Sequence, residues 1–322
     1  MTLVIDQHIP FIVEAIHKEW PQVDIFPMKP EEIAADAVKE ADVLVVRTRT
    51  QVNASLLEGS RVRMVCTATI GFDHIDTTYC ESHGIRWMSC PGCNAQAVCD
   101  YIEEALREFQ MSNVKFQMSN MPTIGIVGVG HVGSLVAKMA QRKGLKVLLN
   151  DPPKGIGVSL DEIAAQCDII TFHVPLTHNL QFPTYHLCNA EFLAKCKPDA
   201  LTINAARGGV VDEKALLASG HPYILDTWEN EPNIDPEVVA HAQLASMHIA
   251  GYSVEGKRNA SQMCLNAIAE QFGLPKINLQ STIFNLQSPT GDTSPGWLTR
   301  LSTQLKSHPE QFETLRKNYR LR

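Results

Sequence analysis

Residues 123–151 read TIGIVGVGHVGSLVAKMAQRKGLKVLLND, and this stretch decides the fold of the chain. It begins with an apolar run, 123–127, that does not alternate, which predicts a strand buried on both faces. A turn with the spacing G-x-G-x-x-G follows, and apolar residues at helical spacing come after it. A second apolar run, 146–149, ends at Asn150 and Asp151. The order predicts a strand, a tight turn, a helix and a second strand.

The glycine spacing meets the physical requirements of a dinucleotide-binding turn. Gly128 allows the tight turn, Gly130 lets backbone N–H groups approach a pyrophosphate, and Gly133 lets the helix pack closely on the strand. The N-terminus of the helix presents unsatisfied donors and the positive end of its dipole to the phosphates. The predicted cofactor-binding residues of this turn are Gly128, Gly130, His131, Val132 and Gly133.

Asp151 ends the second predicted strand, about 20 residues after the turn, where an acid can accept hydrogen bonds from a ribose diol. Its charge would repel a 2′-phosphate, which favours NAD over NADP. A glycine turn alone could be an ordinary connection between a strand and a helix. The strand, the helix and the acid together indicate an NAD site.

Length, composition and charge limit the number of domains, the class of partner and the cellular location that we expect. A chain of 322 residues favours two domains, and 44% hydrophobic with 20% charged residues is ordinary for a globular protein. The net charge of −7 argues against a nucleic-acid or anionic lipid partner. We expect no membrane span, because no apolar run is long enough, and no signal peptide, because the N-terminus lacks a basic segment followed by an apolar one. Nine cysteines, an odd number, predict reduced thiols and a cytoplasmic location.

Cys90 and Cys93 have C-x-x-C spacing, so a zinc or redox site is an alternative to a simple turn. Pro91 and Gly92 separate them, and no second cysteine pair follows at zinc-finger spacing. We interpret the segment as a turn and expect no metal.

Strand and helix patterns alternate along most of the chain, which predicts an α/β protein with two doubly wound parallel sheets. The substrate domain, flavodoxin-like, should comprise 1–93 and 252–277, because a helix at 260–272 is expected to cross back onto it. The NAD-binding Rossmann domain, with six strands, should comprise 94–251, and 278–322 form a C-terminal extension. A duplicated FQMSN, at 109–113 and 116–120, has no functional explanation.

Three predicted strand ends carry ionisable side chains where open α/β sheets place their ligands. Arg207 offers a planar fork for a carboxylate or a developing oxyanion. His248 can carry a proton near neutral pH, and Glu231 can orient it. Asp226 could hold a nicotinamide carboxamide. Each of these residues alone could have a purely structural role. Because they occur together after a dinucleotide-binding turn, we interpret them as functional residues.

With these segments, the chain resembles the D-specific 2-hydroxyacid dehydrogenase family over about 1–275. The glycine turn, the discontinuous first domain and the spacing of the three segments carry the resemblance. It implies that Arg207, Glu231 and His248 form a catalytic triad in an NAD-dependent enzyme.

A closer resemblance is to the branch of this family that oxidises 4-phospho-D-erythronate in vitamin B6 synthesis. It rests on VRTRTQVN at 46–53, CTATIGFDHID at 66–76, PGCNA at 91–95, HIAGYSVEGK at 248–257 and FETLRKNY at 312–319. The last motif resembles a dimerisation segment and implies a homodimer. By motif position the resemblance implies substrate contacts at Thr48, Thr69 and Tyr252, and NAD contacts at Asp151, Thr171, Asp226 and Gly251.

Arg47 and Arg49 flank Thr48 after a predicted strand, which suggests a phosphate-binding pair, although solvated surface charge is about as good an explanation. Two alternatives to the oxidation of 4-phospho-D-erythronate stay open. The enzyme could oxidise another D-2-hydroxy acid, such as 3-phosphoglycerate or glycerate, or the fold could serve an NAD-sensing binding protein.

Overall fold

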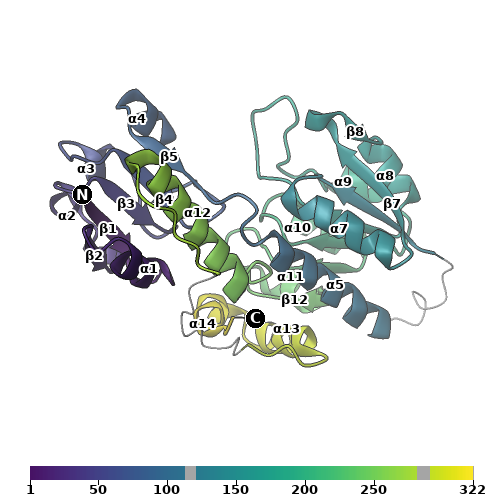
Figure 1. Cartoon of the computed structure of the whole chain (residues 1–322). Coiled ribbons are helices and arrows are strands. Elements are labelled where there is room, and N and C mark those ends of the chain that lie inside the picture. Colours follow the sequence, from purple (N-terminus) through teal and green to yellow (C-terminus); the bar gives the residue numbers. More distant parts are fainter. Residues whose placement is uncertain (113–120, 281–290, 322) are drawn as a thin grey trace. The chain divides into compact units, whose positions relative to one another are not determined.

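The computed structural model describes residues 1–112, 121–280 and 291–321. It divides the chain into two compact units (Figure 1). Unit 1 comprises Met1–Asn94 and Ser253–Ser288, and unit 2 comprises Ala95–Tyr252 and Pro289–Arg322. The second FQMSN copy lies outside the described residues, as does the last residue of the first copy.

Unit 1 contains a five-stranded sheet in the order β2-β1-β3-β4-β5, in which every pair is parallel. Its strands are β1 (Thr2–Asp6), β2 (Asp24–Met28), β3 (Val43–Val46), β4 (Met64–Thr67) and β5 (Arg86–Met88). The two central apolar strands β3 and β4 are buried throughout, as expected where both faces are covered. Its helices are α1 (Ile12–Glu19), η1 (Pro30–Glu32), α2 (Ala35–Val38), α3 (Ala54–Leu57), α4 (Thr77–Ser82) and α12 (Val254–Phe272).

Helix α12 is far in the sequence from the strands of unit 1 and completes the core of that unit (Figure 1). Ser253 caps it by accepting a hydrogen bond from the Gly256 amide at 2.9 Å, so it begins earlier than the apolar pattern at 260–272 indicated. Its buried Leu265 and Ile268 share a core with β1 and α1. The Ser261 hydroxyl donates to the Pro10 carbonyl at 2.7 Å.

Unit 2 contains a seven-stranded sheet in the order β12-β11-β10-β9-β6-β7-β8. Its strands are β6 (Thr123–Val127), β7 (Lys146–Asp151), β8 (Ile156–Gly157), β9 (Ile169–Phe172), β10 (Leu201–Asn204), β11 (Tyr223–Leu225) and β12 (Leu244–Ala245). All pairs are parallel except β7 with β8. The expected count of six strands was wrong because β8 is too short to show a pattern. The predicted α/β class with two mainly parallel sheets is confirmed.

The helices of unit 2 are α5 (Ala95–Ser112), α7 (His131–Arg142), η2 (Pro152–Lys154), α8 (Leu160–Gln166), α9 (Ala190–Lys195), α10 (Glu213–Ser219), α11 (Pro236–His241), α13 (Trp297–Ser307), η3 (Pro309–Gln311) and α14 (Phe312–Asn318). The sequence analysis missed α13, although its buried Trp297, Leu298 and Leu305 belong to the core of the unit. In Figure 1, α13 lies beside β12 and α5.

None of the helices in the described part of the chain is both long and apolar enough to cross a membrane. All nine cysteines are free thiols. Cys90 is buried, and its sulfur lies 3.7 Å from that of Cys264. Within the described residues, no group of three or more His, Cys, Asp or Glu side chains is arranged to hold a metal ion.

Candidate active site

The glycine turn lies between β6 and α7 and has the shape that a dinucleotide needs. Gly128 adopts φ +90°, and a Cβ there would lie 2.6 Å from the His173 carbonyl oxygen. A Cβ on Gly133 would lie 2.0 Å from the Gly128 carbonyl oxygen, so helix and strand pack in close contact. Around Gly130, by contrast, no described atom lies within 4 Å of the Cβ position. The turn is tight on its inner side and open where a pyrophosphate would approach, so these residues fit the cofactor.

Asp151 ends β7 beside this turn and is 8% exposed. Its Oδ2 accepts a hydrogen bond from the Val129 amide at 2.8 Å and lies 3.5 Å from the Lys154 ammonium. Lys154 also donates to the Val129 carbonyl at 2.8 Å. The acid therefore braces the glycine turn with one oxygen, a role that the sequence analysis did not predict.

The other predicted NAD contacts occupy different positions around the sheet. His131 is exposed at the first turn of α7, where Val132 is half-buried. Thr171 is buried in β9, and its hydroxyl lies 3.0 Å from Nε2 of His173. Gly251 is half-buried in the segment after β12.

Asp226 follows β11 and is 1% exposed. Its carboxylate accepts hydrogen bonds from the Ser246 hydroxyl at 2.6 Å and from the amides of Ile249 and Ala250 at 2.8 and 2.9 Å. A carboxylate has about four acceptor positions, so these three bonds leave about one for a nicotinamide amide. The Asp226 carboxylate therefore holds the backbone that follows His248 and the Ser246 side chain that precedes it.

Glu231 and His248 form a hydrogen-bonded pair in which Oε2 of the glutamate lies 2.8 Å from Nδ1 of the histidine. The Trp228 amide donates to the other glutamate oxygen at 2.9 Å and fixes its orientation. Burial raises the pKa of Glu231, but the hydrogen bond and charge of His248, the Trp228 amide and the charge of Arg316 outweigh it, so the pKa is lowered. Glu231 is therefore a carboxylate at neutral pH, suited to hold Nδ1 protonated and leave Nε2 for a substrate.

Arg207 lies on the loop after β10, next to the loop that carries Glu231. Asn204, at the end of β10, shapes this loop by donating to the Arg207 carbonyl at 2.9 Å and accepting from the Ala206 amide at 3.0 Å. A Cβ on Gly208 would lie 1.8 Å from the Trp228 carbonyl oxygen, so the two loops are in close contact. Because β10, β11 and β12 are parallel neighbours, Arg207, Glu231 and His248 all follow strands that end at one edge of the sheet.

The predicted substrate-binding residues of unit 1 lie on the loops after β3 and β4. Arg47 forms a fork with Asp6, at 2.8 Å from Nε and 3.3 Å from Nη2, and Asp6 is fully buried. Thr48 is exposed. Thr69 donates to the Gly71 carbonyl at 2.9 Å and contacts the Thr67 hydroxyl at 2.6 Å. The sequence analysis missed Asp6, which sits on a strand far from Arg47 in the sequence.

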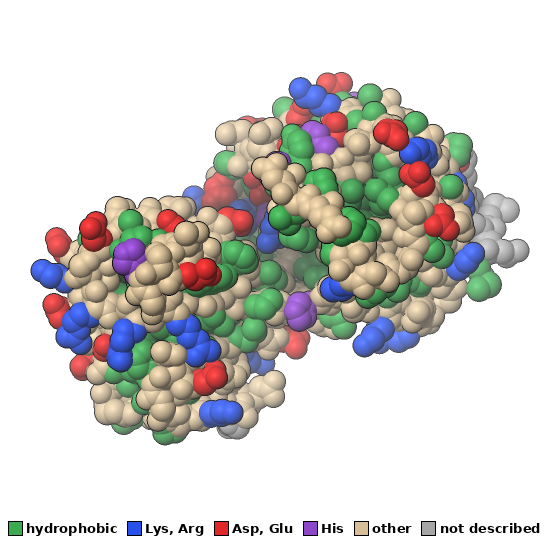
Figure 2. Space-filling view, turned by 90° about the horizontal axis from the view of Figure 1, so that it is seen from above, with side chains coloured by type: hydrophobic (Ala, Val, Ile, Leu, Met, Phe, Trp, Pro, Cys, Tyr) green, Lys and Arg blue, Asp and Glu red, His purple; other side chains and the backbone are tan. Residues whose placement is uncertain are grey.

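Arg47 and Arg49 have different neighbours in unit 1. Arg49 lines a pocket of about 370 Å³ with residues of η1, α2 and α3, whereas Arg47 turns to β1. On the face seen in Figure 2, basic and acidic side chains are interspersed over both units rather than gathered into a surface of one sign. An anionic substrate would therefore depend on a few local cations.

The chain is similar to proteins of known family. The family model described as the NAD binding domain of D-isomer specific 2-hydroxyacid dehydrogenases matches residues 97–270. An erythronate-4-phosphate dehydrogenase of Bacteroides fragilis is 42% identical to this chain, over 100% of the chain and 97% of its own length. The protein of that name from Cronobacter sakazakii is 35% identical, over 100% of the chain and 92% of its own length.

Solved structures share the fold at lower identity. The TT0316 protein of Thermus thermophilus matches with a TM-score of 0.70 and 22% identity, covering 86% of this chain and 99% of its own. The NAD⁺-bound 3-phosphoglycerate dehydrogenase of Entamoeba histolytica matches with a TM-score of 0.68 and 23% identity, covering 87% of this chain and 98% of its own.

Proposed function

Because this chain belongs to the D-isomer specific 2-hydroxyacid dehydrogenase family, we propose that it oxidises 4-phospho-D-erythronate with NAD. The product would be 2-oxo-3-hydroxy-4-phosphobutanoate, an intermediate on the route to pyridoxal 5′-phosphate. The full-length similarity to erythronate-4-phosphate dehydrogenases supports this substrate. The observation that carries the chemistry is the 2.8 Å contact between Glu231 and His248.

In this proposal the cofactor is held by the glycine turn and Asp151, with further contacts from Thr171, Asp226 and Gly251. When bound, NAD supplies the acceptor for the hydride that leaves C2 of the substrate. The open space at Gly130 supports this assignment, since a side chain there would occupy the position of the pyrophosphate.

The three strand-end residues have separate roles in the reaction. His248 accepts the proton of the C2 hydroxyl at Nε2 as the carbonyl forms, and Glu231 stabilises the resulting imidazolium through Nδ1. Arg207 binds the substrate carboxylate with its planar fork and stabilises negative charge on the C2 oxygen. Thr48, Thr69 and Tyr252 are the further substrate contacts that the motif positions imply, and Arg47 is the candidate beside Thr48.

We further propose that the protein is a cytoplasmic homodimer. The nine free thiols support a reducing compartment. The resemblance of 312–319 to a dimerisation segment supports the dimer. Light scattering on the eluting peak of a sizing column would test it: a mass of twice 35.6 kDa is expected, and a monomer would contradict it.

The proposed substrate is tested by the absorbance of NADH formed from a panel of hydroxy acids. The panel contains 4-phospho-D-erythronate, D-erythronate, D-3-phosphoglycerate and D-glycerate. We expect the highest kcat/KM for 4-phospho-D-erythronate. A higher value for another member would assign the enzyme to that acid, and no turnover with any member would contradict the proposal.

A further inference from the structure

The C-terminal segment reaches the candidate active site through helix α14. The guanidinium carbon of Arg316 lies 5.7 Å from the centre of the Tyr252 ring, within the range of a cation–π contact. The ring of Tyr319 lies 6.4 Å from the same ring. Arg316 is also close enough to Glu231 to influence it electrostatically. A cation of α14 thus stands next to a predicted substrate contact and within electrostatic reach of Glu231, the partner of His248.

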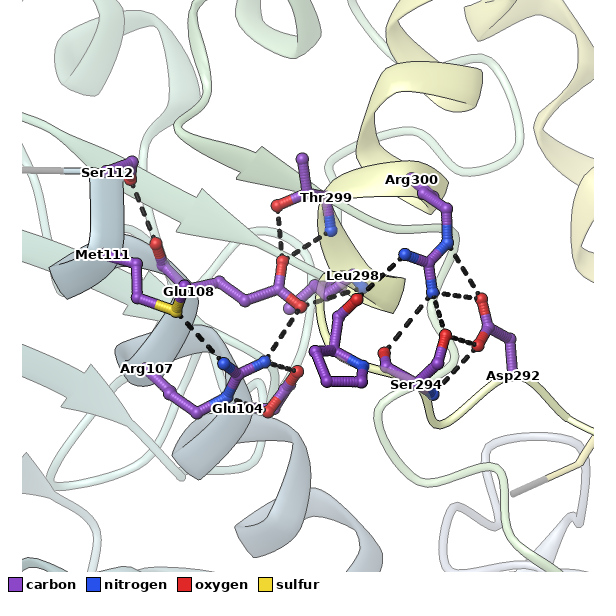
Figure 3. Close-up of polar contacts among 11 residues, drawn as sticks. Glu104, Arg107, Glu108, Met111, Ser112, Asp292, Ser294, Leu298, Thr299 and Arg300 are labelled. Atoms are coloured by element: carbon purple, nitrogen blue, oxygen red, sulfur yellow. Dashed lines mark hydrogen bonds and ion pairs between the residues drawn. The ribbon is translucent and has the colours of Figure 1, made fainter.

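A buried carboxylate fixes this segment on the rest of unit 2 (Figure 3). Glu108 of α5, 6% exposed, accepts hydrogen bonds from the amides of Leu298 and Thr299 at 3.2 and 2.7 Å and from the Thr299 hydroxyl. These donors belong to the first turn of α13, so Glu108 caps that helix from another element. Figure 3 shows the Glu108 side chain pointing from α5 to this turn.

Apolar packing continues from α13 to α14. Trp297, Leu298, Leu305 and Phe312 are buried in the core of unit 2 together with residues of its sheet. The Trp297 ring meets that of Tyr101 edge-on, with centres 6.3 Å apart. The buried Ser302 hydroxyl accepts from the Ala245 amide of β12 at 2.9 Å. The position of Arg316 is therefore set by a packed segment.

Arg316 keeps hydrogen-bonding capacity that the described protein does not use. Its Nε is buried and has no hydrogen-bond partner among the described residues, and its carboxylate contact with Glu313 is long, at 3.9 Å. Two other cations of the segment are engaged: Arg300 with Asp292 at 3.0 Å, and Lys306 with the Ala242 carbonyl. A buried unpaired donor is costly, and a planar guanidinium is well matched to a phosphate group.

We propose that Arg316 binds the phosphate group of the substrate beside Tyr252, so that the C-terminal helix selects phosphorylated over unphosphorylated hydroxy acids. This inference rests on the proposed function and adds a specificity-determining residue to it. A fork of N–H donors suits a phosphate monoester, whereas the unphosphorylated acid would leave the guanidinium unpaired in a partly buried position.

The test compares Arg316→Gln with Lys317→Gln. Lys317 is the neighbouring residue, pairs with the same Glu313 at 3.7 Å and is 56% exposed, so its variant removes an equal charge from the same helix. Dissociation constants of 4-phospho-D-erythronate and D-erythronate are measured by calorimetry on the NADH-loaded enzyme, and kcat/KM is measured for both acids with NAD. Melting curves of each variant identify loss of folding, and Arg316→Lys provides a conservative second variant.

We expect Arg316→Gln to weaken binding of the phosphorylated acid by about 30-fold, as for loss of a charge-assisted hydrogen bond, and to change D-erythronate binding less than threefold. Arg316→Lys should recover part of the loss, and Lys317→Gln should stay within about twofold of wild type for both acids. Equal losses for both acids, or equal effects of the two glutamine variants, would overturn the inference. A wild-type enzyme inactive with 4-phospho-D-erythronate would contradict the proposed function instead, while the calorimetric comparison still decides the role of Arg316.

Discussion

The backbone of Gly208 passes so close to Trp228 that a Cβ on the glycine would lie 1.8 Å from the tryptophan carbonyl oxygen. This contact joins the loop that carries Arg207 to the loop that carries Glu231, since the Trp228 amide in turn binds Glu231. The proposed catalytic groups are therefore positioned by backbone contacts between neighbouring strand ends.

Gly208→Ala tests this coupling. Because the clash is with backbone, one of the two loops must move, and we expect kcat/KM to fall at least tenfold with a loss of stability of about 1–3 kcal/mol. Gly130→Ala is the matched control for stability, since no described atom lies within 4 Å of its Cβ position. Steady-state kinetics and urea unfolding measure both effects. Wild-type kinetics in Gly208→Ala would show that the loops are not coupled.

Asp151→Ser tests how the nucleotide is selected. Removing a carboxylate that would repel a 2′-phosphate should raise the ratio of kcat/KM for NADP to that for NAD by about tenfold or more. Lys154→Ala is the control, because it removes a nearby cation and should not raise this ratio. An unchanged ratio in Asp151→Ser would mean that Asp151 binds the Val129 amide but does not select the nucleotide at its ribose.

Glu213 contacts the loop that carries Glu231, and its ionisation should make the stability of the protein depend on pH. It is 5% exposed and accepts from the Glu229 amide at 2.6 Å, and burial, followed by neighbouring carboxylates, raises its pKa to about 8. Its folded-state pKa exceeds the unfolded value, so the folded state holds more protons between about pH 4.5 and 8. Stability should fall with rising pH over this window by at most about 1.4 kcal/mol per unit.

Glu213→Gln should remove this component of the pH dependence. Urea unfolding should therefore find the variant more stable than wild type at pH 8, with little difference near pH 4.5. Glu237→Gln, at an exposed position of α11, is the control and should follow wild type. A wild-type slope in Glu213→Gln would assign the pH dependence to other groups.

Glu108→Ala tests the attachment of the C-terminal segment. Loss of the buried cap of α13 should lower the free energy of unfolding by about 1–3 kcal/mol and raise the KM for the phosphorylated substrate, because Arg316 would lose its fixed position. The control is Glu103→Ala on the same helix, which removes a partly exposed contact of 2.8 Å with Lys143 and should cost less than about 1 kcal/mol. If both variants are equally stable, the cap does not hold the segment.

The sequence predicted the elements whose signals are local. The glycine turn, the apolar run before it and Asp151 lie within one stretch of chain, and β6 begins and ends where the pattern indicated. The strand-end residues Arg207, Glu231 and His248 could be selected because parallel strands place their carboxyl ends at one edge.

Contacts between distant segments could not be predicted in this way. Glu108 and Thr299 are 191 positions apart, and neither carries a local signal of the other. Asp6 and Arg47 meet because β1 and β3 pair, which the strand patterns alone do not specify. The apolar spacing of Trp297, Leu298, Leu301 and Leu305 is helical, so α13 could have been found from the sequence.

In the proposed reaction His248, oriented by Glu231, carries the proton. The decisive variant is His248→Asn. Turnover of 4-phospho-D-erythronate is measured on one preparation of it, and NADH affinity is measured on the same preparation by fluorescence titration. We expect kcat to fall at least about a hundredfold while NADH affinity stays within threefold of wild type. Turnover near the wild-type rate would contradict this role of His248.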